Sequence, residues 1–555
     1  MPVKGLRSVK WLVPLLGLAL VAAACSSKSN SGGGTTTGGT KEGGTLSYAA
    51  DQEPTGFNNN TSKDHGTSVV NITVNMFPNA FNVAPDLSVK LNSDLFDSAD
   101  LTKQNPETIV YKIKQNAAWS DGTPFSADDF IYAWQHQNGK NPKFDVAGTT
   151  GYASIKSVTG SDNGKTVTVV YAKPFADWKN VFTQILPAHY MKSLPGTDAQ
   201  QWNDGIDKNP EKLPSAGPFV VQNYTVGSSL TLKRNDNYFG PKAHLDSVVF
   251  RFLPASTAQP AALQNSEVDL IYPQPQLDEV KQVEGMPDVS SQINFGLSFE
   301  HLDFNFKNQF LSDLKVRQAI ATGLNRDDIV TRTVKQFSSK ASVLGNRIWL
   351  SGQQYYEDHS GNYGKGDVAA AKQLLEGDGY TMGSGGYYAK GGKTLEIRFS
   401  TTAGNQLREQ QGVLFQSQMK AIGVKVDIAN SVSKTLFGDW LPKGNFDVAD
   451  FAWVGDPFAI SSSQDIYRTG GGGNYGKLAD PKVDSMFEQA VAELDPAKSA
   501  ALGNQLDQQI WADMATIPLY QKPTFIAWRN TFTGIVDNTS QYGPFTQAFA
   551  WAQKA

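Results

Sequence analysis

Residues 118–130 read AWSDGTPFSADDF. Serine is one of the residue types favoured at a helix N-cap, and an acidic residue three positions later can return the hydrogen bond in a capping box. Ser126 and Asp129 have this spacing, and the residues that follow would bury Phe130 and Trp134 on one face of a helix. We therefore predict a capped helix that begins just after Ser126.

Strands and helices alternate on both sides of this stretch. Residues 108–113 (TIVYKI) and 166–171 (TVTVVY) have the two-residue alternation of half-buried strands, and residues 44–50 (GTLSYAA) predict a first strand. Apolar residues recur at helical spacing in four further segments, namely 316–324, 367–379, 483–494 and 502–514. The mixture predicts an α/β fold.

Length and composition indicate a globular protein with more than one core. The chain has 555 residues, 40% hydrophobic and 18% charged, with a formal net charge of −4. A chain of this length exceeds what one hydrophobic core usually supports, so we expect two lobes. Lysine and arginine form no basic run, and we therefore expect no nucleic-acid partner.

The N-terminus has the pattern of a secreted lipoprotein. Lys4, Arg7 and Lys10 precede the apolar run 11–24, which is too short to span a bilayer comfortably. Small residues then lead to Cys25, as in a bacterial lipobox, where the cysteine is lipidated and becomes the new N-terminus. We expect a signal peptide at 1–24, and a lipidated Cys25 with a Gly/Ser/Thr-rich tether at 25–43. Because Cys25 is the single cysteine, we expect no internal disulfide.

Motifs of catalysis and metal binding do not occur in the sequence. The six histidines are scattered without an H-E-x-x-H pattern, and there is no G-x-S-x-G elbow. Residues 160–166 (GSDNGKT) approach a phosphate-binding loop but are one residue short between the glycines. Asn163-Gly164 instead predicts a two-residue hairpin turn, and Gly391-Gly392 predicts a second one. We expect no enzymatic activity, no cofactor and no metal.

Six motifs, in order, resemble the peptide/nickel class of extracellular solute-binding proteins, family 5. The resemblance covers nearly all of the mature chain. Its motifs are GGTL at 43–46, AWSDGTPFSADDF at 118–130, SAGPF at 215–219 with LKRNDNY at 232–238, FN at 304–305 with VRQAI at 316–320 and NR at 325–326, the helix 368–380, and IPLY at 517–520.

The resemblance implies a periplasmic-binding-protein-like α/β fold of type II, cluster C. This is a two-lobed Venus flytrap with an extra subdomain in the first lobe. By analogy the first lobe covers 44–300 plus 521–555, with the subdomain at about 81–210, and the second lobe covers 301–520. The implied crossings between the lobes lie at 302–305 and 519–520.

The resemblance also implies a function. The protein would be a monomeric, membrane-anchored substrate-binding lipoprotein outside the cytoplasmic membrane. It would capture short peptides and deliver them to the permease and ATPase subunits of an ABC importer. Alternatives that stay open are another solute (an oligosaccharide, a nickel chelate, an opine or a glycolipid) and a non-transport regulatory lipoprotein.

Asp456, in the stretch FAWVGDP, is the main candidate for ligand binding. It matches the aspartate with which peptide-binding family members hold the ligand's α-ammonium, and a charge-assisted hydrogen bond in a closed cleft suits that role. Pro457 follows at once where several residues often intervene in the family. The alternative for Asp456 is a residue that caps a turn, because Asp-Pro is common in turns.

Five further candidates come from the same resemblance. Trp453 matches an aromatic residue that lines the cleft, with core packing as its alternative. Tyr48, Asn474 and Tyr475 lie where family ligand contacts often fall, with ordinary loop positions as their alternative. Arg347 is a candidate for the ligand's carboxylate, although the sequence favours a solvated surface arginine there.

Overall fold

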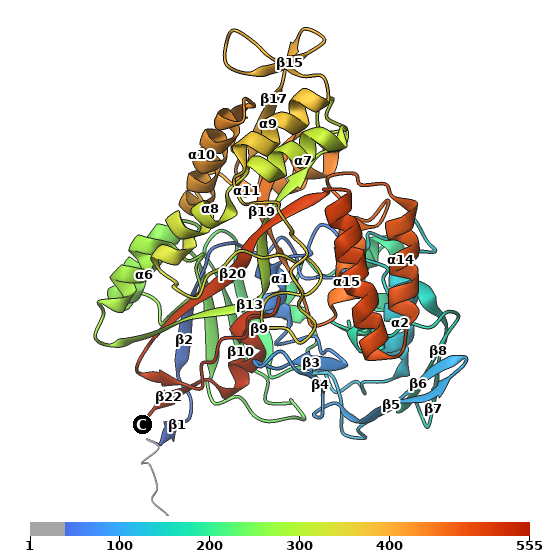
Figure 1. Cartoon of the computed structure of the whole chain (residues 1–555). Helices are drawn as coiled ribbons and strands as arrows, with labels where there is room; N and C mark the ends of the chain where they lie inside the picture. The colour runs from blue at the N-terminus through green and yellow to red at the C-terminus, as the bar shows by residue number, and fades with distance from the viewer. Residues whose placement is uncertain (1–38) are drawn as a thin grey trace, which may run out of the picture. The chain divides into compact units, whose positions relative to one another are not determined.

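A mixed sheet of ten strands is the largest sheet of the structure, a computed structural model that describes residues 39–555 (Figure 1). It belongs to the unit formed by Thr40–Ala555. Along the sheet the strands follow the order β18 (Lys425–Ile428), β17 (Glu396–Ser400), β19 (Val448–Val454), β13 (Val289–Phe304), β20 (Thr516–Arg529), β12 (Leu270–Ile271), β2 (Thr45–Ala50), β11 (Ser247–Phe252), β10 (Ser229–Arg234) and β9 (Phe219–Thr225).

Strands β13 and β20 join the two halves of this sheet. They have 16 and 14 residues and pair antiparallel from Val289↔Arg529 to Asp303↔Thr516. The register shifts between Phe295 and Phe299, so the ladder is interrupted near its middle. The predicted crossings at 302–305 and 519–520 lie in these strands or directly at their ends, while the lobe boundaries stay a prediction.

The two largest buried apolar clusters lie on different halves of the sheet. One is built mainly from residues between Leu46 and Phe250 and is completed by C-terminal residues such as Trp551. The other is built from residues between Leu302 and Tyr520. The length of the chain predicted more than one hydrophobic core, and these two large clusters agree with that prediction.

A buried ion cluster holds α10 (Gln406–Ala421) against β13. Arg408 Nε lies 2.5 Å from Glu300 Oε1, and Lys522 Nζ of β20 lies 3.5 Å from Glu300 Oε2. Burial raises the pKa of Glu300, but the charges of Arg408 and Lys522 outweigh burial and hold this pKa below its ordinary value. The cluster therefore ties together the strands that run between the two halves.

A separate antiparallel sheet lies within the predicted subdomain at 81–210. Its order is β5 (Phe96–Gln104), β6 (Glu107–Ile113), β8 (Thr166–Tyr171) and β7 (Ile155–Ser161), and α2 (Ala127–Gln137) packs on it. The predicted capping box is confirmed, because the Ser126 side chain accepts from the start of α2 and Asp129 Oδ2 accepts from Ser126 N at 3.0 Å.

Both predicted hairpins form, one of them with a longer loop than expected. Ser161 pairs with Thr166, so four residues rather than two connect β7 and β8, and Asp162, Asn163 and Gly164 all have positive φ. The two-residue loop predicted there is wrong, because three consecutive residues take up the left-handed conformation. At Gly391-Gly392 the two-residue turn between β15 (Tyr388–Lys390) and β16 (Lys393–Thr394) is confirmed.

The predicted helices at 316–324, 367–379, 483–494 and 502–514 are confirmed with small shifts at their ends. Helices α14 and α15 lie side by side (Figure 1). The helices are α1 (Thr67–Thr73), α3 (Ala188–Ser193), α4 (Asp198–Asp204), α5 (Gln259–Gln264), α6 (Leu277–Glu284), α7 (Leu314–Gly323), α8 (Arg326–Arg332), α9 (Val368–Gly377), α11 (Ser433–Thr435), α12 (Leu441–Lys443), α13 (Ala459–Tyr467), α14 (Pro481–Ala492) and α15 (Pro496–Ala512).

Short elements complete the chain. Small sheets contain β1 (Thr40–Lys41), β22 (Ala552–Lys554) and β21 (Phe532–Thr533); β3 (Phe81–Val83) and β4 (Val89–Leu91); and β14 (Thr381–Met382) with β15 and β16. Short 3-10 helical segments are η1 (Tyr152–Ser154), η2 (Trp178–Asn180), η3 (Pro210–Lys212), η4 (Ser256–Ala258), η5 (Val334–Gln336) and the longer η7 (Gly543–Ala550), and η6 (Leu436–Trp440) is a π-helical segment. Within residues 39–555, no helix is long and apolar enough to cross a membrane.

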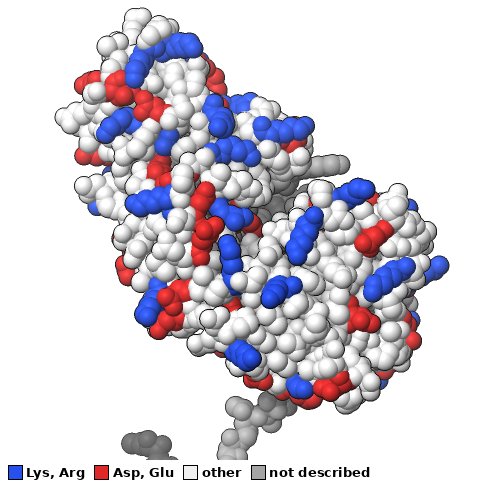
Figure 2. All heavy atoms as spheres, turned by 90° about the vertical axis from the view of Figure 1, so that its right-hand side faces the viewer, with Lys and Arg blue, Asp and Glu red and all other residues white. Residues whose placement is uncertain are grey.

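Charged side chains of both signs are interspersed on the face that Figure 2 presents. Lysine and arginine do not gather there into a stripe.

Candidate functional site

Asp456 lies two residues beyond the end of β19, where the chain turns into α13. Phe458 N–H donates to Asp456 Oδ1 at 2.8 Å, which fixes the turn before the helix. The Asn180 amide donates to Asp456 Oδ2 at 3.2 Å, although the two residues are 276 positions apart. The residue therefore has the capping role that was its alternative, and it also contacts a distant segment.

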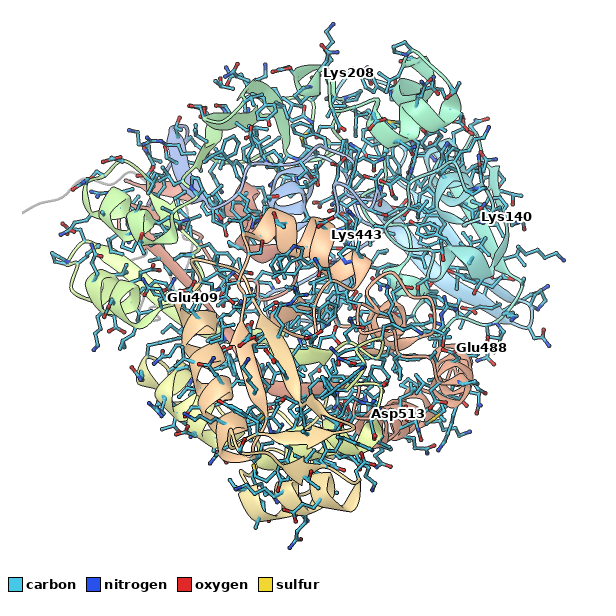
Figure 3. All side chains as sticks on the ribbon, turned by 90° about the horizontal axis from the view of Figure 1, so that it is seen from above. Lys140, Lys208, Glu409, Lys443, Glu488 and Asp513 are labelled. Carbon is cyan, nitrogen blue, oxygen red and sulfur yellow. The ribbon has the colours of Figure 1, made fainter. Side chains whose placement is uncertain are left out.

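Residues 148–180, which belong to the predicted first lobe, contact residues 456–491 of the predicted second lobe at three further places. Ser461 N–H donates to Asp177 Oδ2 at 3.3 Å, and Thr150 Oγ1 donates to Asp465 Oδ2 at 3.2 Å. A backbone hydrogen bond of 2.7 Å runs from Ala176 N to Val491 O at the end of α14. In the view from above, Glu488 of α14 and Lys140, which precedes the segment 148–180, lie on the same side of the molecule (Figure 3). The two parts of the chain meet directly at Asp456.

The electrostatic surroundings of Asp456 disfavour its ionised form. Burial raises its pKa to about 7, and the negative charge of Asp177 adds to this effect, against the opposing hydrogen bonds from Phe458 and Asn180. Burial likewise raises the pKa of Asp177. The groups that hydrogen-bond to Asp456, namely Phe458 N–H, the Asn180 amide and the Ser462 hydroxyl, are all neutral. A cation placed beside this carboxylate would restore its charged form.

An aromatic platform precedes Asp456 on β19. The rings of Trp453 and Tyr475 stack with centroids 5.7 Å apart and an interplanar angle of 16°. The ring of Phe451 packs edge-on against that of Trp453 with centroids 5.3 Å apart. The centroid of the His301 ring, on β13, lies 6.1 Å from that of Trp453. The Trp453 indole N–H is buried without a hydrogen-bond partner among the described residues. Trp453 and Tyr475 are half-buried, so they combine core packing with a surface that a ligand can contact.

Gly473 makes the close approach of this platform possible. A Cβ at position 473 would lie 3.0 Å from Trp453 Cη2, so a side chain there would push against the indole. Asn474 is 5% exposed and accepts from Leu478 N while donating to the carbonyls of Arg468 and Leu478. It fixes the loop that carries Tyr475, and its proposed ligand contact stays a prediction.

Two candidates lie in the protein interior. Tyr48 is 4% exposed within β2 and packs edge-on against Phe250 and Phe545. The solvated surface position that the sequence favoured for Arg347 is wrong, because its side chain is fully buried and pairs with Asp507 at 3.1 Å. Its remaining hydrogen bonds go to Thr516. An ion partner 160 positions away makes this burial possible.

The remaining sequence candidate, Cys25, and the larger pocket add no described residue to the site at Asp456. Cys25 and the signal peptide lie outside the described residues. No group of three or more His, Cys, Asp or Glu residues between 39 and 555 could hold a metal ion. A pocket of about 610 Å³ lies elsewhere, lined by residues that include Asp121, Tyr190 and Lys212, and none of the predicted site residues lines it.

Sequence reasoning missed the residues that contact Asp456 from the first half of the chain. Asp177 precedes η2 and Asn180 is its last residue, in the stretch ADWKN, which has no pattern that distinguishes it from an ordinary turn. Their role depends on a contact over more than 270 positions. No local signal in the sequence could have found them.

Comparisons with known proteins agree with this architecture. The sequence model of the bacterial extracellular solute-binding proteins, family 5 Middle, matches residues 90–475. The oligopeptide-binding protein OppA of Mycobacterium tuberculosis is 32% identical over 507 residues, which cover 90% of this chain and 84% of OppA. The oligopeptide-binding protein AppA of Bacillus subtilis is 26% identical over 548 residues, which cover 95% of this chain and 94% of AppA.

Solved structures resemble the fold over almost its full length. The periplasmic EDTA-binding protein EppA has a TM-score of 0.89 and 30% identity, covering 94% of this chain and 98% of EppA. AppA of Bacillus subtilis, solved with a nonapeptide, has a TM-score of 0.81 and 23% identity, covering 93% of this chain and all of AppA. The chain therefore belongs to the bacterial extracellular solute-binding proteins of family 5 and has their two-lobed, periplasmic-binding-protein-like α/β fold.

Proposed function

We propose that this protein captures short peptides between its two lobes for an ABC importer, and that Asp456 binds the peptide's α-ammonium. The observation that carries this proposal is the state of the Asp456 carboxyl. It is half-buried, it accepts hydrogen bonds from the neutral groups of Phe458, Asn180 and Ser462, and its pKa of about 7 reflects burial beside the like charge of Asp177. Such a carboxyl gains most from a ligand that supplies a positive charge.

A ligand at Asp456 would touch both halves of the structure. Asp456 extends from β19, and Asn180 approaches it from the first half of the chain. A ligand stabilises a closed state only through contacts that the open state lacks. An ammonium bound between these segments meets that requirement, because it can bond to Asp456 while the rest of the peptide lies along the aromatic platform of Trp453 and Tyr475.

The peptide assignment is supported by two relatives named as oligopeptide-binding proteins, OppA and AppA. The main alternative is a metal chelate, because EppA, named as an EDTA-binding protein, has 30% identity and a TM-score of 0.89 to this chain. A chelate of that kind is anionic, so the two ligand classes make opposite demands on Asp456. The sign of the charge on the ligand group that contacts Asp456 therefore distinguishes a peptide from a chelate.

Isothermal titration calorimetry with di- to pentapeptides tests the proposal. We expect free-amine peptides to bind and their N-acetylated counterparts to bind at least about tenfold more weakly, since a buried carboxylate loses its ionic partner. Asp456→Asn should abolish this difference. Titration with a metal–EDTA complex is the parallel experiment. Binding of the complex, with no heat from any peptide, would replace the peptide by a chelate.

The anchor, the importer and the absence of catalysis belong to the same proposal. Lipidation of Cys25 would hold the protein on the outer side of the cytoplasmic membrane, from which it would deliver ligand to a permease and its ATPase as a monomer without enzymatic activity. In cells, the protein should fractionate with membranes, and Cys25→Ser should release it into the soluble fraction. Membrane association of a Cys25→Ser protein that mass spectrometry shows to have lost residues 1–24 would exclude the lipid anchor at this residue.

A further inference from the structure

The hairpin of β3 and β4 carries a leucine in a conformation that leucine rarely adopts. Leu87 has φ 63°, in the left-handed region that favours glycine and is uncommon for bulky side chains. Leu87 N–H donates to Ala84 O at 2.8 Å and Ala84 N–H donates to Ser88 O at 2.9 Å. The loop at 84–88 thus contains a turn followed by a left-handed residue, a position where glycine is the usual choice.

The rest of the loop is built to hold this conformation. Pro85 fixes its own φ at the first turn position, and Asp86 Oδ1 accepts from Ser88 N at 3.0 Å and from the Ser88 hydroxyl at 2.5 Å. A disfavoured backbone at Leu87 persists only if surrounding contacts compensate for it. The side chain of Leu87 therefore needs a favourable environment beyond the hairpin.

That environment spans the two parts of the molecule. On the side of the first lobe, Leu87 packs against a cluster of Val70, Val83 and Tyr542. It also packs against a second cluster, formed by Leu297 and Phe299 of β13 with Leu344 and Leu350 from the predicted second lobe. Leu87 is half-buried and contributes to both clusters.

The second of these clusters adjoins the candidate ligand site. Trp453 packs against it, three positions before Asp456 on the same segment. The Asp456 charge also acts on Tyr542 of the first cluster, where burial first and then this charge raise the pKa of the phenol. Leu87 therefore packs against an apolar cluster to which both predicted lobes contribute, next to the site. The contacts at Asn180, Asp177 and Thr150 are polar.

We propose that Leu87 is a positioning residue for ligand capture: its side chain packs into the second lobe on closure and stabilises the closed, ligand-holding state. The inference rests on the proposed binding of a ligand between the lobes. Leu344 and Leu350 approach Leu87 only when the lobes meet, so packing on these two residues would favour the closed state over the open one. In the open state the same leucine would keep its disfavoured backbone without the compensating contact.

The test separates the side chain of Leu87 from its backbone. In Leu87→Asn the new residue tolerates positive φ but lacks the apolar contact, and in Leu87→Met the apolar contact is kept. Val226→Ala is the matched control, because Val226 is a 76% exposed apolar residue on another first-lobe hairpin. We expect Leu87→Asn to weaken binding of a free-amine tetrapeptide about tenfold, mainly through faster dissociation, and the other two variants to bind as wild type does.

The thermal unfolding temperature of the ligand-free variants distinguishes a closing role from a merely structural one. Asparagine loses the apolar contact with Val70, Val83 and Tyr542 but tolerates the left-handed backbone at position 87. The unfolding temperature of Leu87→Asn should therefore fall only slightly below that of Leu87→Met, while its affinity falls about tenfold. Wild-type affinity in Leu87→Asn, or an equal loss in Leu87→Met or Val226→Ala, overturns the inference.

A ligand-independent readout keeps the two proposals apart. If the wild-type protein binds no peptide, the peptide proposal fails, and small-angle scattering then judges Leu87 on its own. A larger radius of gyration for Leu87→Asn than for wild type and Leu87→Met supports the closing contact. Identical radii for all three proteins overturn it.

Discussion

Replacing Asp456 with asparagine should stabilise the ligand-free protein at pH 8 and leave its stability unchanged near pH 4. Burial and the Asp177 charge raise the pKa of Asp456 from 3.8 to about 7 in the folded state. A raised pKa means that the folded state prefers the protonated carboxyl, so this preference stabilises the fold fully below pH 4 and is lost as pH rises to 7. Asparagine does not titrate and avoids that loss.

The magnitude follows from the shift of the pKa. A shift of about three pH units corresponds to an upper limit of about 4 kcal/mol, and partial solvent access to the half-buried side chain reduces this to about 1–3 kcal/mol. In a protein of this size, we expect each kcal/mol to move the unfolding temperature by about 1–2 °C. The variant should therefore unfold a few degrees above wild type at pH 8.

Differential scanning calorimetry from pH 4 to pH 8 measures this difference directly. Other titrating groups contribute nearly equally to both proteins, so the difference between them isolates position 456. A free-amine peptide should reverse the order at pH 8, because its ammonium stabilises the ionised Asp456 of the wild type alone. A difference in unfolding temperature that stays constant from pH 4 to pH 8 would refute the reasoning, as would a variant less stable than wild type at pH 8.

Three further substitutions have distinct expected outcomes. Arg347→Met leaves the buried Asp507 with His359, 2.8 Å away, as its remaining ionic partner, and should lower the free energy of unfolding by about 2–4 kcal/mol in thermal denaturation. An unchanged unfolding temperature would mean that the Arg347–Asp507 pair is dispensable. Trp453→Leu removes the stacked indole and should weaken peptide binding about tenfold in calorimetric titration, whereas wild-type affinity would exclude Trp453 from the site. Gly473→Ala places a Cβ 3.0 Å from Trp453 Cη2 and should shift the tryptophan fluorescence while weakening binding severalfold; unaltered fluorescence would show that the loop adapts.

Local patterns in the sequence predicted the local structure well. The capping box of Ser126 and Asp129 forms as expected, because both partners lie within one helical turn. The periodic helices α14 and α15 also form where apolar spacing indicated them. In each case the residues that determine the element are neighbours in the chain.

Features that depend on distant partners were not predictable in the same way. Arg347 was expected at the surface because an unpaired arginine belongs there, and only the fold brings Asp507 to it. Asn180 contacts Asp456 across 276 positions without any local pattern. Leu87 takes a backbone conformation that its residue type opposes, so propensity points away from the observed structure.

A crystal structure of the protein with a free-amine tetrapeptide tests the central claim most directly. The account predicts that the peptide's terminal nitrogen lies about 3 Å from a carboxylate oxygen of Asp456, within reach of Asn180 and beside the ring of Trp453. A peptide whose amino group faces solvent, or which lies in the first-lobe pocket near Asp121, would contradict it.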